Sequence, residues 1–187
     1  MQDKINVSAI GNPPAPARPG WLQTFVIGRR PKATLIRILV VIFACFVTFN
    51  FVLLPIRVTG ISMEPTYRDH QIDCVNKLAY LRHEPRRGDV VAIRLSDLGI
   101  FGRPADMLMK RIIGLPGESV SFHAGRVYIN GRLLDEPYLK TFCDWEHPPV
   151  QCGPDQYYVV GDNRDMSFEN HVKGLFRRND IVGKVLL

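Results

Sequence analysis

Ser62 and Lys110 are the two residues whose types and surroundings make them candidates for nucleophilic catalysis. Ser62 lies in the segment Val58–Thr66, between a glycine and a proline, where the simplest interpretation is a turn residue. It follows Leu54, the end of a long apolar run, by eight residues. Those residues span at most roughly 25 Å, at about 3.3 Å per residue. A serine at that place needs a nearby base before it can attack a carbonyl carbon.

Lys110 is the candidate base, and it lies in the segment Met107–Gly114, whose pattern predicts a strand. On a strand it shares a face with Leu108 and Ile112, and burial against apolar neighbours lowers the pKa of a lysine toward neutrality. Arg111 is equally flanked by apolar residues, so alternation predicts that one of the two cations faces solvent. Only a lysine can lose its proton near neutral pH, so only Lys110 could act as the base.

Two further polar groups leave alternatives open. His70, beside Asp69, would complete a Ser-His-Asp triad with Ser62, and spacing does not exclude it because triad members are rarely close in sequence. The polar segment Gly161–Ser167 follows the strand-like run Tyr157–Val160. It is either a turn with local side-chain hydrogen bonds or an oriented polar network beneath an active site.

The elements that would position these residues begin with an apolar run. The residues from Ile38 to Leu54 carry no charge, and extension to residues 35–56 gives about the 20-residue length that spans a bilayer. A buried core helix and the apolar part of a cleaved signal are the alternatives. A cleaved signal needs a short leading segment and a small-residue exit, whereas 34 residues precede this span and Pro55 to Arg57 close it. We therefore predict a retained transmembrane helix over residues 35–56.

Positive charge is concentrated before that helix. The chain has a formal net charge of +6, and residues 1–37 hold six basic side chains against one acidic side chain, Asp3, which leaves +1 for the remainder. A clustered basic face that would bind nucleic acid is therefore not predicted. Residues 1–34 are basic and proline-rich, which predicts a cytoplasmic tail. The positive-inside rule then places the C-terminal domain outside a cell membrane that the chain crosses once.

Residues 57–187 predict an all-β domain, because short apolar runs alternate with turn residues and no long amphipathic helix interrupts them. The clearest local signal is Asn130-Gly131, since this pair supplies the two positive φ angles of a type I′ hairpin within residues 126–134. We expect a mainly β, antiparallel, partly closed fold. The other predicted strands cover residues 72–75, 89–93, 120–122, 157–160 and 181–187.

Cys143 and Cys152 flank a loop-like stretch. In an oxidising compartment these two residues would close a small disulfide loop, and a pair of free thiols is the alternative. A metal site is disfavoured, because the four cysteines and five histidines of the chain show no CxxC or HxxxH spacing.

Four segments follow the apolar run in a fixed order. They are Gly60-x-Ser62-Met63-x-Pro65-Thr66, Gly88-Asp89-Val90-Val91, Lys110–Glu118, and Gly161-Asp162-Asn163-Arg164-Asp165-x-Ser167 with Gly183-Lys184 behind it. Together they resemble the motifs of the type I signal peptidases, which are membrane-bound proteases with a serine and a lysine in the active site. Each motif alone is weak support, whereas the ordered set covers most of residues 50–187.

The resemblance implies a role for each matching residue. Ser62 would attack the scissile carbonyl, and neutral Lys110 would take its proton and return it to the leaving amine. Ser167 is similar in position to the serine that orients the lysine. Arg111 and Asp162 match an ion pair that shapes the site. No metal and no organic cofactor is implied.

Three further features of the sequence bear on the resemblance. Gly60 stands where some members carry a hydroxyl that helps the Ser62 backbone N–H to bind the oxyanion, so a second donor has to come from elsewhere. Met63 is expected to form a wall of the substrate pocket. The segment Glu169-Asn170-His171 stands where the family usually has Asp-Ser-Arg. In this chain a histidine therefore replaces an arginine of the local salt-bridge network.

The function implied is that of a membrane-anchored serine endopeptidase, which removes N-terminal signal peptides from exported proteins after small residues in an Ala-x-Ala pattern. Its partners would be those signal peptides, the lipid bilayer and the protein translocation channel. A specialised relative that matures one substrate, such as a conjugative pilus subunit, is an alternative. A catalytically silent binder is another, and the presence of both Ser62 and Lys110 argues against it.

Overall fold

The computed structural model describes residues 31–95, 107–141 and 144–186. The chain divides into two compact units, residues 1–44 and 45–187, and each is described by itself. Helix α2 (Pro31–Val47) forms the described part of the first unit, and its proline suits the first turn of a helix because φ is already fixed there. Its last residues belong to the second unit, where the π-helix η1 (Thr48–Val52) continues it.

The helical stretch Lys32–Val52 is long and apolar enough to cross a membrane. It has 21 residues with a mean hydropathy of 2.5, and its apolar side chains are not buried within the protein. At about 1.5 Å per residue it is roughly 32 Å long, which matches the apolar core of a bilayer. The helix ends before the predicted limit at Ile56, because Leu53–Arg57 forms strand β1 and pairs with a neighbouring strand. The domain limits 1–34, 35–56 and 57–187 stay a prediction.

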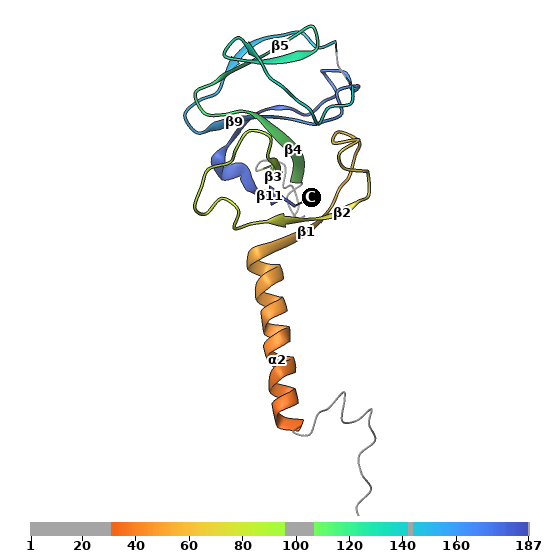
Figure 1. Cartoon of the computed structure of the whole chain (residues 1–187), viewed down its shortest axis with the longest axis vertical. Helices are drawn as coiled ribbons and strands as arrows, with labels where there is room; N and C mark the ends of the chain where they lie inside the picture. Colours follow the sequence, from red (N-terminus) through yellow and green to blue (C-terminus); the bar gives the residue numbers. More distant parts are fainter. Residues whose placement is uncertain (1–30, 96–106, 142–143, 187) are drawn as a thin grey trace, which may run out of the picture. The chain divides into compact units, whose positions relative to one another are not determined.

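The second unit contains two antiparallel sheets (Figure 1). The larger sheet has seven strands in the order β1-β2-β11-β3-β4-β9-β10, and the smaller has four in the order β7-β6-β5-β8. The sheet that contains β5 lies at the end of the unit away from β1 and β2 (Figure 1). The larger sheet comprises β1 (Leu53–Arg57), β2 (Ile72–Asn76), β3 (Val90–Arg94), β4 (Met107–Gly114), β9 (Gln156–Val160), β10 (Gly174–Arg177) and β11 (Ile181–Val185). The smaller comprises β5 (Ser119–His123), β6 (Arg126–Ile129), β7 (Arg132–Leu133) and β8 (His147–Gln151), and a 3₁₀ turn, η2 (Arg178–Asp180), precedes β11.

The predicted fold class is confirmed: the fold is mainly β and antiparallel, with one apolar helix before it. Both sheets are open rather than closed into a barrel, because β1 and β10 are the edges of one and β7 and β8 the edges of the other. Asn130 and Gly131 have φ angles of 51° and 76° between β6 and β7, as the hairpin prediction requires.

The core is divided by the larger sheet into two clusters, one on each face. Alternate residues of β3 enter different clusters: Val90 and Ala92 pack with Met63, whereas Val91 and Ile93 pack with Ile112. A slip of one residue in β3 would exchange two sets of apolar side chains that differ in size, so the packing of both clusters favours the observed register. The neighbouring β4 therefore presents its residues at defined positions.

A third apolar cluster lies around the smaller sheet and includes Phe122, Trp145 and Cys152. Cys152 is buried and forms no disulfide with another described residue. Its predicted partner, Cys143, lies outside the described residues, so the disulfide stays a prediction.

Candidate active site

The loop between β1 and β2 carries Ser62. Two apolar side chains of this loop, Met63 and Tyr67, are fully buried in the core, and the Tyr67 N–H donates to the Met63 carbonyl at 3.0 Å. At its start, the Gly60 N–H donates to Asp69 Oδ1 at 2.9 Å. The loop is thus anchored on both sides of Ser62, whose side chain is half-buried at the wall of a cavity.

Lys110 reaches Ser62 from β4. Its Nζ donates a hydrogen bond to Ser62 Oγ across 2.6 Å, and only 2% of the lysine is exposed. Burial lowers the pKa of Lys110 to about 8, and the negative charge of Asp162 opposes that shift. An amine with such a pKa is neutral in a useful fraction of molecules near neutral pH, so it can take a proton from the hydroxyl that it contacts.

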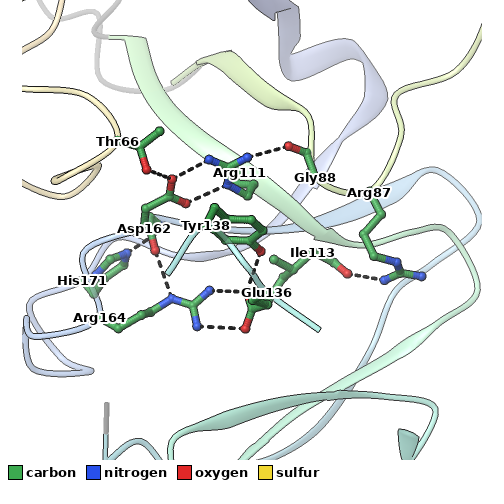
Figure 2. Close-up of polar contacts among 11 residues, drawn as sticks. Thr66, Arg87, Gly88, Arg111, Ile113, Glu136, Tyr138, Asp162, Arg164 and His171 are labelled. Atoms are coloured by element: carbon green, nitrogen blue, oxygen red, sulfur yellow. Dashed lines mark hydrogen bonds and ion pairs between the residues drawn. The ribbon is translucent and has the colours of Figure 1, made fainter. Parts of the chain in front are cut away.

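Arg111 is also buried, which corrects the expectation that one of the two adjacent cations faces solvent. Its Nε and Nη2 donate to the two carboxylate oxygens of Asp162 at 2.8 and 2.5 Å, and its Nη1 donates to the Gly88 carbonyl at 2.8 Å (Figure 2). Thr66 Oγ1 adds a bond to Asp162 at 2.6 Å. Periodicity missed this because a fully paired guanidinium can occupy a buried position that an unpaired one cannot.

The segment after β9 is pressed against the backbone of the serine loop. Asn163 donates from its N–H to the Ser62 carbonyl at 3.0 Å and from Nδ2 to the Ile61 carbonyl at 2.9 Å. A Cβ at Gly161 would lie 2.1 Å from the Ser62 carbonyl oxygen, so only glycine fits there. Together these contacts support the interpretation of Gly161–Ser167 as an oriented network rather than a plain turn.

A second buried ion pair lies beside the first. Arg164 donates to both carboxylate oxygens of Glu136, at 2.7 and 3.3 Å, and Tyr138 donates to Glu136 at 2.6 Å. The Tyr138 ring also stacks on Arg111, 3.9 Å from the guanidinium carbon, and so joins the two pairs (Figure 2). Sequence reasoning missed Glu136 and Tyr138, because they follow the β6–β7 hairpin outside every motif and no local pattern marks them.

His171 is a further residue whose role was missed. It is buried, and its Nε2 accepts the Gly161 N–H at 2.7 Å. In the sequence, this position differs from the family motif only in carrying histidine where arginine is usual, and that difference does not indicate the contact with Gly161.

Of the remaining predicted site residues, some lie at the cavity and one does not contact Lys110. Met63 lines the cavity next to Ser62, and its role in binding substrate stays a prediction. Gly60 has a φ of 94°, and its N–H is already used by Asp69. Ser167 is exposed and, among the described residues, forms no side-chain hydrogen bond with Lys110. The structure therefore brings together Ser62, Lys110, Arg111 and Asp162 but not Ser167.

His70, the alternative base, does not share this environment. It is exposed and lies 3.4 Å from Asp69, whereas the contact of Ser62 Oγ is with Lys110. The geometry thus favours Lys110 over the triad.

A cavity of about 430 Å³ adjoins Ser62 and Lys110. Its walls come from β1, the serine loop, β3 and the first half of β4. Most of the wall residues are apolar, and they include Ile56, Met63, Ala92, Leu108 and Met109. Among the described strands, β3 alone pairs with Met107–Lys110, while β9 pairs with β4 from Arg111 onward. Within the part of the chain that the structure describes, one backbone edge of β4 is therefore open beside the cavity.

Comparisons with known proteins agree on one family. The family described as "Signal peptidase, peptidase S26" matches residues 32–187. The chain is similar to the probable signal peptidase I-2 of Synechocystis, with 37% identity over 126 residues, 67% of this chain and 58% of that protein. It is also similar to signal peptidase I P of Bacillus subtilis subsp. natto, with 30% identity over 170 residues, 83% of this chain and 89% of that protein.

One solved structure is also similar, a signal peptidase I from Enterococcus faecalis V583. It is 26% identical, with a TM-score of 0.42 over 55% of this chain and 97% of that one. The chain spans less than two thirds of the length of the Synechocystis relative.

Proposed function

This chain belongs to the signal peptidase family, peptidase S26, and from that membership we propose that it is a membrane-anchored serine endopeptidase that removes signal peptides. The observation that carries the proposal is the 2.6 Å contact between Ser62 Oγ and the buried Nζ of Lys110. In the proposed reaction, neutral Lys110 takes the hydroxyl proton as Ser62 attacks the scissile carbonyl. It then gives that proton to the leaving amine, and water hydrolyses the ester that remains on Ser62.

The backbone N–H of Ser62 is the proposed oxyanion donor. In the described part of the chain it has no hydrogen-bond partner, and the Asn163 bond to the Ser62 carbonyl holds its loop in place. The Gly60 N–H is unsuited to be the second donor, because Asp69 already accepts from it. A donor of this kind contributes roughly 3–4 kcal/mol to the transition state, so the Ser62 peptide must be well oriented.

The substrate is proposed to bind as an extended strand along the open edge of β4. Main-chain hydrogen bonds to a free strand edge would hold a peptide of almost any sequence. Alternate side chains of an extended peptide point the same way, so the first and third residues before the cut would both face the cavity wall. That wall is apolar, with Met63 and Leu108 among its residues, which suits small residues such as alanine.

The helical stretch Lys32–Val52 is the proposed anchor. Ser62 lies ten residues after Val52, so the nucleophile would stay close to the membrane, at about 3.3 Å per residue. The basic residues before the helix favour a cytoplasmic N-terminus and a catalytic domain outside. Signal peptides emerging from the translocation channel would then be within reach, with the lipid bilayer as the other partner.

The test is cleavage of an exported precursor whose signal ends in Ala-x-Ala, by the full chain in detergent. We expect the parent to cut after the second alanine, and Ser62→Ala and Lys110→Ala each to lower kcat by more than about a thousandfold. His70→Ala, with the alternative base removed, should remain active. No cleavage of any precursor by the folded parent would contradict a general signal peptidase, and cleavage of one dedicated substrate would support the specialised relative.

A further inference from the structure

The imidazole of His171 is buried, and its Nε2 accepts the Gly161 N–H at 2.7 Å. Acceptance at Nε2 requires a ring without a proton on that atom, so the neutral ring carries its proton on Nδ1. Nδ1 itself is buried without a hydrogen-bond partner among the described residues. The one acceptor atom of the neutral ring is therefore used by the Gly161 N–H.

The charges around the ring keep it neutral. Burial first, and then the cations Lys110, Arg164 and Lys173, lower the pKa of His171 to about 3. The backbone of Asn163 acts in the opposite direction but is too weak to reverse the shift. The ring also meets the edge of Trp145, with ring centroids 5.0 Å apart. With its pKa lowered in this way, His171 stays neutral, and its Nε2 stays a hydrogen-bond acceptor, over the pH range in which Lys110 loses its proton.

Gly161 connects His171 to the nucleophile. The carbonyl of Gly161 accepts from Arg164 Nε at 3.1 Å, so the peptide groups on both sides of this residue are held by hydrogen bonds. An added Cβ would lie 2.1 Å from the Ser62 carbonyl oxygen and 2.7 Å from His171 Nε2. Gly161 is therefore packed between the imidazole and the backbone of the serine.

We propose that His171 is a positioning residue, which acts through Gly161 to fix the segment Gly161–Asn163 against the backbone of Ser62. The role rests on the proposed function, because its consequence is the orientation of the oxyanion donor on Ser62. An arginine, the residue usual at this place in the family, would offer only donors to the Gly161 N–H. This chain should therefore not tolerate the arginine, whereas a glutamine, whose amide oxygen can accept near the place of Nε2, should replace the histidine.

The first experiment compares kcat and KM of the full-length chain with those of three variants, each corrected for its folded fraction by circular dichroism. His171→Gln should stay within about fivefold of the parent kcat, while His171→Leu and His171→Arg should lose about 10- to 100-fold, because the Gly161 N–H is left unpaired. KM should change little, since no substrate contact is removed. His123→Gln, an exposed histidine, is the matched control. Equal kcat per folded molecule in all variants, or an arginine variant better than the glutamine variant, would overturn the proposal.

The second experiment does not depend on activity. Nuclear magnetic resonance of the ¹⁵N-histidine-labelled full chain in detergent should show His171 as the Nδ1–H tautomer, without titration from about pH 5 to pH 9. In His171→Leu, exchange of the Gly161 amide hydrogen should speed up by at least about tenfold. A ring that titrates near its ordinary pKa, or the other tautomer, would refute the positioning role even in an active enzyme. If the proposed function is wrong but the positioning role is right, the parent will be inactive, while the Nδ1–H tautomer, the absence of titration and the faster Gly161 exchange in His171→Leu will still be observed.

Discussion

Lys110 and Arg111 are adjacent on β4 and both buried, but the energetic cost of burying their charges is reduced in different ways. Arg111 cannot lose its proton, and a bidentate bond with Asp162 neutralises it. Lys110 contacts a neutral hydroxyl instead, and its pKa falls. The sequence identified Lys110 as the possible base because of this chemical difference, but the burial of Arg111 depends on a carboxylate 51 residues away.

The lowered pKa of Lys110 has a measurable cost in stability. Its pKa is about 8 in the folded chain against 10.5 for the unperturbed group, so the unfolded chain binds more protons between these values and stability rises with pH there. The penalty is fully present below pH 8 and is lost toward pH 10.5. Lys110→Met should therefore raise the free energy of unfolding by up to about 3 kcal/mol at pH 7 and by much less at pH 10, measured by urea denaturation. A methionine variant less stable than the parent at pH 7 would contradict this.

The ion pair between Arg111 and Asp162 should behave differently. Asp162→Asn leaves a buried guanidinium without its counter-charge, and we expect a loss of about 3–5 kcal/mol in the free energy of unfolding. The control is Glu84→Gln, which removes a carboxylate that is 75% exposed from its pair with Arg178 and should cost less than about 1 kcal/mol. Similar losses for both variants would show that the buried pair is not special.

At the scale of elements, sequence patterns found the strands that carry clear apolar runs and missed three others. β1 was hidden in the apolar run that precedes it, and β8 contains two prolines in a stretch that reads as a loop. β10 begins at Gly174, whose φ of 135° is unusual in a strand. The motifs located Ser62 and Lys110, because the proposed nucleophile and the proposed base are each restricted to a few residue types. The supporting contacts of Glu136 and Tyr138 arise only when the second sheet folds beside the first, so no local pattern could predict them.

The close approach of the segment after β9 to the serine loop gives a prediction at this scale. Gly161→Ala should push the serine loop away and lower kcat by at least about a hundredfold, because even a small misplacement of reacting groups is costly. Gly153→Ala is the matched control, since its Cβ would meet only the flexible end of Gln156. Cleavage assays of both variants, with circular dichroism to verify folding, provide the measurement. An alanine at position 161 with parental activity would show that the contact does not position Ser62.

At the scale of the whole molecule, the proposed anchor and the basic residues before it predict one orientation. Protease added to the outside of spheroplasts should degrade the catalytic domain, and an N-terminal tag should be cut only in inside-out vesicles. Alkaline carbonate should leave the chain in the membrane fraction, as expected of a spanning helix. A tag that is accessible from outside would reverse the proposed topology. Extraction of the chain by carbonate would contradict a membrane-spanning helix.

The Ser62–Lys110 pair is tested most directly by the pH dependence of kcat/KM for precursor cleavage. If neutral Lys110 is the base, activity should rise with pH through a single ionisation near pH 8, the pKa that burial gives this lysine. Lys110→Ala should abolish the activity at every pH, and His70→Ala should leave the profile unchanged. A midpoint near 6.5, the ordinary pKa of histidine, or activity that survives Lys110→Ala, would contradict the serine–lysine mechanism.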